Sequence, residues 1–356
     1  MNRAPIAEII DPADAEGLRA PWRALADRAE PNAFADPDFL LPLVAHCAPK
    51  RLKFVVVWAD ADRASLIGLA AVAPPPIALG LARVWMHALA AGPALLVDPA
   101  HVEGALSALM AALSAARAGA GLLIPHVETE TALIAALRAR DHRLVARTAR
   151  AALPCGRNAN FDGHLPQKRK KEWGRQRRRL ADGGALEHSA TGQDIEPFLI
   201  LEAAGWKGKR GTALAQSADL AAFARQMAKN FAARGAIAIH TLRRGGAPFA
   251  AGIVLRSDRR AYYWKTAFDE TVAALSPGVQ LTLAMSARLE TDPGLDLVDS
   301  CAIADHPMID RLWPARIALD DIALPLGAAT PFHLARKAHE WRIRLRARVK
   351  ALAGRG

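Results

Sequence analysis

The sequence predicts an α+β protein in which mixed, largely antiparallel sheets are flanked by helices. Short apolar runs joined by polar turns, as in residues 236–268, have the alternation and the tight links of antiparallel hairpins. Longer segments with apolar residues at helical spacing lie between such runs, as in residues 217–234. A strand–turn–strand pattern at residues 55–72 has a counterpart at 237–255, so we expect two halves of similar plan.

The N-terminal half mixes one hairpin with helix–strand patterns, and an irregular stretch separates it from the second half. Residues 154–160 interrupt the apolar patterning, and we place the joint there. The elements expected before that joint are a helix at 14–29, a turn-rich connector at 32–39, strands at 52–58 and 66–73, a helix at 101–118, a strand at 122–127, a helix at 129–140 and a strand at 144–148.

The C-terminal half is built around a three-stranded meander that leads into a helix. Ser276 is the expected N-cap of that helix and Pro277 its first residue. The elements expected here are helices at 165–180, 195–204 and 217–234, strands at 236–242, 249–255 and 261–268, a helix at 276–290, strands at 295–300 and 316–324, and a basic helix at 333–352.

Composition narrows the class of protein. Lys and Arg number 47 against 35 Asp and Glu, a net charge of +12. This balance favours an anionic partner and a soluble basic surface equally well. Three widely spaced cysteines form no C-x-x-C pair, so we expect buried thiols rather than a zinc site or disulfides. Acidic residues within residues 1–19, and prolines and charges within 65–99, predict neither a signal peptide nor a membrane span, and hence a cytoplasmic protein.

Residues 165–180 are the most charged part of the chain. Trp173 and Leu180 are seven residues apart, so one narrow helical face can dock while the basic residues face outward. A run of charge is usually a solvated face. The density of cationic side chains nevertheless favours a binding role, and Arg169 and Lys170 are candidate ligands for phosphates or an anionic acceptor. No zinc-finger, RRM or KH pattern accompanies them, so sequence-specific nucleic-acid binding is not expected.

Residues 205–212 combine glycines, cations and one tryptophan. Such a loop can close over a substrate, which makes Trp206 and Lys207 candidate substrate-binding residues. Trp206 can equally serve only to pin the loop to its domain.

Lys265 lies in the middle of an aromatic strand, where a lysine must be paired, exposed in a cleft or catalytic. Strand alternation predicts Tyr263 and Lys265 on one face, and Tyr263 is a further candidate substrate-binding residue. Lys265 can stabilise an oxyanion or anchor a carboxylate while Asp269 or Glu202 accepts a proton, and we expect it to line an open pocket. The alternative is a structural ion pair between Lys265 and one of these acids. His240, on a strand among apolar neighbours, is more typical of a satisfied core histidine than of a base.

Several motifs in one order resemble the FemAB-like, CelD-type branch of the GNAT acyltransferase superfamily. They are Glu202-Ala-Ala-Gly-Trp-Lys-Gly208, Gly211-Thr212, Trp264-Lys265, Phe268-Asp269-Glu270 and Ser276-Pro277-Gly278. The resemblance covers residues 165–326 well. The first half resembles the family in outline, through Trp22 and residues 32–39.

The resemblance implies tandem GNAT-like domains. A degenerate one would span residues 1–155, an acyltransferase domain 156–330 and a basic C-terminal helix 331–356. In this superfamily the donor enters a splay between two central strands, and the amine acceptor attacks it directly without a protein nucleophile. The helix start that follows takes the donor phosphates, which makes Ser276, Gly278, Val279 and Gln280 the candidate donor-binding residues.

The resemblance leaves the donor and the acceptor open. Ser-Pro-Gly is shorter than the usual glycine-rich loop, and Pro277 removes one amide donor, which argues against ordinary CoA pyrophosphate binding. Plain helix initiation alone would also explain Ser276 and Pro277. Acyl-CoA, an acyl carrier protein and an aminoacyl-tRNA all remain as donors, with a small or polymeric amine as acceptor and no metal.

Two functions follow from these observations. One is an N-acyltransferase with a role in envelope or polysaccharide metabolism. The other is a catalytically inactive GNAT-like module that binds anionic partners, including an acidic membrane surface, through basic helices at residues 168–179 and 336–350.

Overall fold

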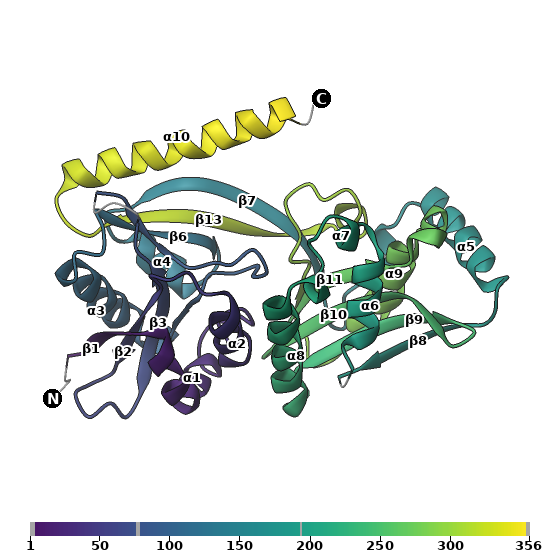
Figure 1. Ribbon diagram of the computed structural model, residues 1–356, viewed down its shortest axis with the longest axis horizontal. Helices are drawn as coiled ribbons and strands as arrows, with labels where there is room; N and C mark the ends of the chain where they lie inside the picture. The colour runs from purple at the N-terminus through teal and green to yellow at the C-terminus, as the bar shows by residue number, and fades with distance from the viewer. Residues whose placement is uncertain (1–3, 76–78, 193, 354–356) are drawn as a thin grey trace. The chain divides into compact units, whose positions relative to one another are not determined.

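A computed structural model describes residues 4–75, 79–192 and 194–353 (Figure 1). The chain divides into two compact units that interleave in sequence. Unit 1 consists of Met1–Pro37, Ala48–Thr148 and Ala318–Gly356, and unit 2 of Asp38–Cys47 and Ala149–Ile317.

Unit 1 is built on a mixed sheet with one parallel pair. Its strands follow one another in space in the order β1-β2-β3-β4-β6-β13, with β5 beside β3. Strands β4 and β6 run parallel, and the other neighbours for which a register is defined are antiparallel. The strands are β1 (Ile6–Ile10), β2 (Lys53–Trp58), β3 (Leu66–Ala73), β4 (Leu81–Val84), β5 (Leu95–Val97), β6 (Gly121–Glu128) and β13 (Ala315–Pro325).

Unit 2 repeats this plan strand for strand. Its strands follow one another in the order β8-β9-β10-β11-β12-β7. Strands β8 to β11 are antiparallel neighbours, β11 and β12 run parallel, and β7 pairs antiparallel with β12. The strands are β8 (Leu186–Thr191), β9 (Ile237–Arg244), β10 (Ala247–Ser257), β11 (Arg260–Phe268), β12 (Leu297–Asp299) and β7 (Arg143–Pro154). The predicted α+β class and the similar plan of the two halves are confirmed.

The helices of unit 1 cover an aliphatic core. Leu106, Leu109 and Leu113 recur at helical spacing on α3 and are buried against valines and leucines of the sheet. Trp22 on α1 donates from its indole to the Ala35 carbonyl at 2.9 Å, which fixes the connector that follows. The helices are η1 (Pro12–Leu18), α1 (Arg19–Ala26), η2 (Pro99–His101), α3 (Val102–Ala115), α4 (Ala132–Arg138) and α10 (Ala329–Ala353).

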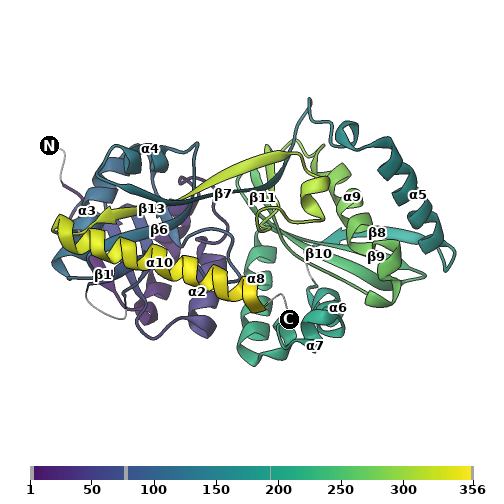
Figure 2. The same cartoon turned by 90° about the horizontal axis from the view of Figure 1, so that it is seen from above.

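The helices of unit 2 lie on both faces of its sheet. Figure 2 shows α6 and α8 on one side of strands β8–β11 and α5 and α9 on the other. On the α8 side, the rings of Phe39, Phe223 and Trp264 pack edge to face. The helices are α2 (Pro37–Cys47), η3 (Asp162–His164), α5 (Gln167–Ala181), α6 (Glu196–Ala204), α7 (Trp206–Lys209), η4 (Leu214–Gln216), α8 (Ala218–Ala233), η5 (Glu270–Leu275), α9 (Pro277–Leu289) and η6 (Ile309–Arg311).

The compact units are not continuous segments of the chain, unlike the three domains proposed from the sequence. Helix α2 belongs to unit 2 although it lies within residues 1–155, and residues 318–330 belong to unit 1. Strands β7 and β13 each begin in one unit and end in the other, which continuous boundaries at 155 and 330 cannot represent. Whether residues 1–155, 156–330 and 331–356 act as functional domains stays a prediction.

Candidate active site

A β-bulge in β11 sets the direction of its side chains. Ile253 of β10 faces Lys265, and the next residue, Val254, faces Tyr263, so Trp264 is an extra residue in β11. The Tyr263 hydroxyl lies 3.4 Å from Thr282 Oγ1 on α9, whereas Lys265 faces α6. The expectation that Tyr263 and Lys265 share a face is therefore wrong, because the bulge shifts the alternation by one residue.

Lys265 belongs to a group of charges around Glu202, which we call the Glu202 cluster. Glu202 Oε1 lies 2.9 Å from Lys207 Nζ and 3.8 Å from Lys265 Nζ. Its Oε2 accepts a hydrogen bond of 2.9 Å from the backbone N–H of Leu214. The Glu202 side chain is fully buried, so its charge depends on these partners.

Within this cluster, the pKa of Lys265 is shifted. Its side chain is 16% exposed, and burial lowers the pKa of its ammonium group to about 8, with a further lowering by Lys207 and an opposing effect of Glu202. The ammonium group also lies 5.4 Å from the centre of the Trp264 ring. Lys265 is therefore charged at neutral pH but gives up its proton more readily than an exposed lysine.

A small cavity of about 30 Å³ opens next to the cluster. Its wall includes Glu202, Trp206 and Lys207, together with Thr266 and Glu270. Lys265 is not part of this wall, so the structure does not place its amine at this opening.

The loop that carries Trp206 and Lys207 forms the one-turn helix α7. Lys207 is anchored by Glu202 and by the Thr266 carbonyl at 3.4 Å. Trp206 is 49% exposed, and the guanidinium group of Arg210 stacks 5.2 Å from its ring centre. The loop is thus held through its charged residues and backbone, and Trp206 leaves much of its surface available to a ligand.

Asp269 has a local structural role. Its side chain accepts hydrogen bonds from the backbone N–H and the hydroxyl of Thr271, at 2.9 and 2.7 Å, and caps η5. Among the described residues it makes no ion pair with Lys265, which leaves Glu202 as the acid that the structure brings to Lys265.

The start of α9 is more enclosed than the sequence suggests. Ser276 has a left-handed backbone (φ 54°), and its side chain does not cap the helix. Gly278 is buried, and a β-carbon there would lie 3.4 Å from the Phe268 ring. The Gln280 side chain donates to the Trp173 carbonyl at 3.0 Å. Of the four candidate donor-binding residues, only Ser276 and Val279 are partly exposed.

The bond from Gln280 brings the basic helix α5 to the start of α9. As predicted, α5 buries Trp173 and Leu180 and leaves most of its basic residues at the surface. Arg169 pairs with Glu172 at 3.3 Å and Lys170 with Asp162 at 2.8 Å. Both cations lie one helical turn before Trp173, and their pairs are exposed enough to exchange for a stronger anion.

The pairing of the parallel strands β11 and β12 ends beside these groups, because β12 itself ends. Their pairing ends at Tyr262 and Asp299, while β11 continues to Phe268. Tyr263, the first residue beyond the pairing, is buried, and burial raises the pKa of its phenol. Where β12 ends, Asp299 pairs with Arg150, and both side chains are almost fully buried. Sequence reasoning missed Arg150, since it gave strand β7 only as far as residue 148.

Comparisons with known proteins agree with this geometry. Residues 167–306 match the family model described as "Acetyltransferase (GNAT) domain". This part of the chain resembles a GNAT acetyltransferase domain, and the chain has a FemAB-like fold. That fold follows from the solved structure of FemX, with a TM-score of 0.53 and 11% identity over 86% of this chain and 95% of that one.

A second solved structure supports the same fold. It is the C-terminal domain of a putative lysylphosphatidylglycerol synthetase from Agrobacterium fabrum, with a TM-score of 0.57 and 12% identity over 92% of this chain and 96% of that one. No curated protein sequence matches the chain. None of the helices in the described ranges combines the length and the apolar character that a membrane crossing requires.

Unit 2 brings together some of the residues expected at the site and separates others. Glu202, Trp206, Lys207 and Lys265 lie together on the α6 face of the sheet. Tyr263 faces α9, and Arg169, Lys170 and Ser276–Gln280 lie on the helices that cover that face. Within the part of the chain that the structure describes, no group of three or more His, Cys, Asp or Glu side chains could hold a metal ion.

Proposed function

We propose that the protein transfers an acyl or aminoacyl group from a thioester or ester donor to an amine. The end of the β11–β12 pairing at Tyr262 carries this proposal, because β11 continues to Phe268 without β12 as its neighbour. A donor lying beside this part of β11 would pass Tyr263 and reach the start of α9. The acceptor would approach from the opposite face, where the cavity at Glu202 opens.

The chemistry needs a neutral amine at the donor carbonyl. Its nitrogen bonds to the carbonyl carbon, the C–S or C–O bond of the donor breaks, and the nitrogen loses a proton. Glu202 is the acid in the cavity wall, and we assign to it the binding of the acceptor amine and the removal of that proton. Lys207 and Lys265 hold its carboxylate in place, and Asp269 positions η5.

The Tyr263 phenol has a distinct role in this scheme. Because burial raises its pKa, the phenol keeps its proton and can donate a hydrogen bond to the donor or its leaving group. Trp206 and Lys207, at the cavity, would contact the acceptor.

The proposal also concerns the chemical class of the donor. Little of the α9 start is left for a CoA pyrophosphate. Gly278 is enclosed, the Gln280 side chain is already hydrogen-bonded to a backbone carbonyl, and Pro277 has no N–H. This favours an aminoacyl ester, and the fold shared with FemX and with the lysylphosphatidylglycerol synthetase domain supports the same preference. Arg169 and Lys170 would then contact the donor phosphates. We also propose that the protein acts in envelope metabolism and is located in the cytoplasm.

A thermal-shift panel followed by a transfer assay tests the proposal. CoA, acyl-CoA, acyl carrier protein and charged tRNA are each added to the full chain. A donor at one hundred times its Kd should stabilise the protein by about 2.7 kcal/mol. Glu202→Gln should then slow transfer at least about a hundredfold, whereas Lys229→Met on the exposed face of α8 should leave the rate unchanged.

Two results would count against this function. Absence of stabilisation by every donor, together with salt-sensitive binding to acidic vesicles, would favour the alternative of an inactive module that binds through α5 and other basic helices. Full activity of a folded Glu202→Gln protein would show that Glu202 is not needed for the reaction. The class of donor would still be decided by the thermal-shift panel.

A further inference from the structure

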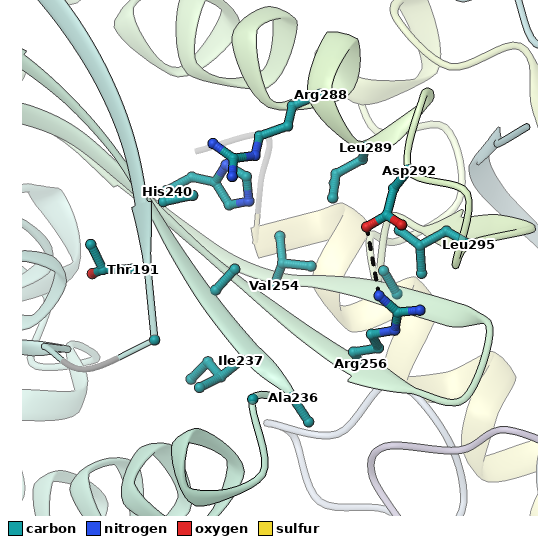
Figure 3. A pocket seen from close by; sticks show the side chains of 15 residues that line it. Thr191, Ala236, Ile237, His240, Val254, Arg256, Arg288, Leu289, Asp292 and Leu295 are labelled. Atoms are coloured by element: carbon teal, nitrogen blue, oxygen red, sulfur yellow. Dashed lines mark ion pairs between the residues drawn. The ribbon is translucent and has the colours of Figure 1, made fainter.

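A cavity of about 240 Å³ lies in unit 2 at the sheet end where β9 and β11 begin and β8 and β10 end (Figure 3). The last turn of α9 forms one side of it, through Arg288 and Leu289. The candidate donor-binding residues stand at the other end of that helix, at Ser276–Gln280. This cavity is therefore separate from the proposed acyl-transfer site, and nothing inferred for it depends on that function.

His240 lines this cavity and has one buried ring nitrogen without a hydrogen-bond partner among the described residues. The residue is 1% exposed and lies on β9, and its Nδ1 is 3.1 Å from Nε2 of His188, whose ring stacks on it. No described residue lies within hydrogen-bonding distance of His240 Nε2. The expectation of a satisfied core histidine therefore holds for one ring nitrogen only. A buried polar atom without a partner is costly, which suggests that a ligand supplies one.

The His240 ring can donate a hydrogen bond to an anion from Nε2 when that nitrogen carries the proton of the neutral ring. Burial, then the nearby His188 and Arg288, lowers the pKa of its ring to about 3, so the ring is neutral at physiological pH. A neutral imidazole carries one N–H. In the tautomer in which His240 Nδ1 accepts from the Nε2–H of His188, the N–H of His240 stands at Nε2.

Arg288 supplies the charge. Figure 3 shows its guanidinium group beside the His240 ring. In the described parts of the chain it makes no hydrogen bond or ion pair, whereas the other arginine of the cavity, Arg256, is paired with Asp292 at 3.6 Å and bonds to the Gly294 carbonyl. Arg288 is thus the cation that remains available to a ligand.

We propose that this cavity binds a small aliphatic carboxylate. Its oxygens would accept hydrogen bonds from the Arg288 guanidinium group, whose planar fork matches a carboxylate, and from His240 Nε2–H. Its carbon chain would lie against Ile237, Val254 and Leu289, which give the cavity an apolar wall. The volume is below the roughly 300–1,000 Å³ of pockets for drug-sized ligands, so a short chain is the right size.

Unit 1 offers a matched control at the equivalent place in its own sheet. A cavity of about 350 Å³ lies where β2 begins and β3 ends, beside the end of α3. Arg117, just after α3, lines it, as Arg288 in the last turn of α9 lines the cavity of unit 2. No histidine lines it, and its Lys53 is paired with Asp11. The cavity of unit 1 therefore has an arginine, Arg117, but no buried imidazole.

The test is a titration of the full chain labelled with ¹⁵N at histidine. Butyrate, isovalerate and inorganic phosphate are the probes, and the His240 Nε2 resonance is the readout. The carboxylates should shift this resonance saturably. Arg288→Gln should weaken their binding at least about tenfold, and Arg117→Gln should change it by less than about twofold.

Three outcomes would overturn the proposal. The first is no saturable shift up to about 50 mM, well above millimolar Kd values. The second is phosphate binding as tight as that of isovalerate, which would mark a general anion site. The third is unchanged affinity in Arg288→Gln. His240→Gln, which keeps an N–H donor, should retain weaker binding, and its thermal melt shows whether it folds.

Discussion

Lys265 shows how one residue can be identified from a sequence while its surroundings are not. A lysine within an aromatic strand is unusual enough to mark the position, and the structure gives it a buried acid and a lowered pKa. Its direction could not be predicted, because the bulge at Trp264 leaves no trace in the alternation of residue types. For the same reason Tyr263 was assigned to the wrong face.

The lowered pKa of Lys265 has a measurable effect on stability. Between the folded pKa of about 8 and the unfolded value of 10.5, the unfolded chain binds more protons, so stability rises with pH across this window. Relative to Lys265→Met, the wild-type protein should gain up to about 3 kcal/mol in the free energy of unfolding as pH rises from 8 to 10.5.

Urea denaturation of both proteins at several pH values measures this difference, because other titrating groups cancel in the comparison. Lys229→Met, at an exposed lysine of α8, is the control and should show a flat difference. A flat difference for Lys265→Met as well would mean that the lysine is hydrated and has an ordinary pKa.

At the scale of elements, α7 depends on one close approach. A β-carbon at Gly208 would lie 1.7 Å from the Ala203 carbonyl oxygen at the end of α6, so only glycine fits. The motif Gly-Trp-Lys-Gly marks this loop in the sequence, but its use as a helical turn depends on a contact that residue type alone does not reveal.

Gly208→Ala should therefore displace α7 and draw Lys207 away from Glu202. We expect a loss of about 1–3 kcal/mol in the free energy of unfolding, typical of an overpacked site. We also expect weaker acceptor binding, seen as a raised KM. Gly156 has open space around its α-carbon but a positive φ. The better control is Gly17, where a β-carbon would meet nothing within 4 Å and φ is not in the left-handed region.

Equal stability and KM in Gly208→Ala and Gly17→Ala would show that α7 is loosely held. A loss confined to Gly208→Ala would confirm that the α6–α7 contact positions Lys207.

Strands were predicted well where alternation and turns coincide, as in β9, β10 and β11. Strands β1 and β8 were missed because short, partly exposed edge strands bury too little to show an apolar pattern. Helix α2, which follows the connector predicted at residues 32–39, was missed because Pro42 inside it argues against a helix.

At the scale of the whole molecule, unit 2 needs parts of the first half. Phe39 on α2 packs against Phe223 and Trp264, and Arg150 on β7 neutralises the buried Asp299. A protein limited to residues 156–330 should therefore not unfold cooperatively, because it lacks both contributions.

Calorimetry and near-UV circular dichroism of that fragment and of the full chain test this expectation. A sharp fragment transition at the temperature of the full chain would show that residues 156–330 fold independently, as the continuous domain boundaries propose. Arg150→Met in the full chain isolates the contribution of the buried pair, and we expect a loss of about 3–5 kcal/mol.

The two crossing strands also constrain biosynthesis. Most of β13, the strand that completes the sheet of unit 1, follows unit 2 in the chain. As the polypeptide emerges from the ribosome, the earlier half has to wait with one edge of its sheet uncovered until the later half has been made. Unit 1 can therefore complete its sheet only after the chain has been synthesised through Pro325.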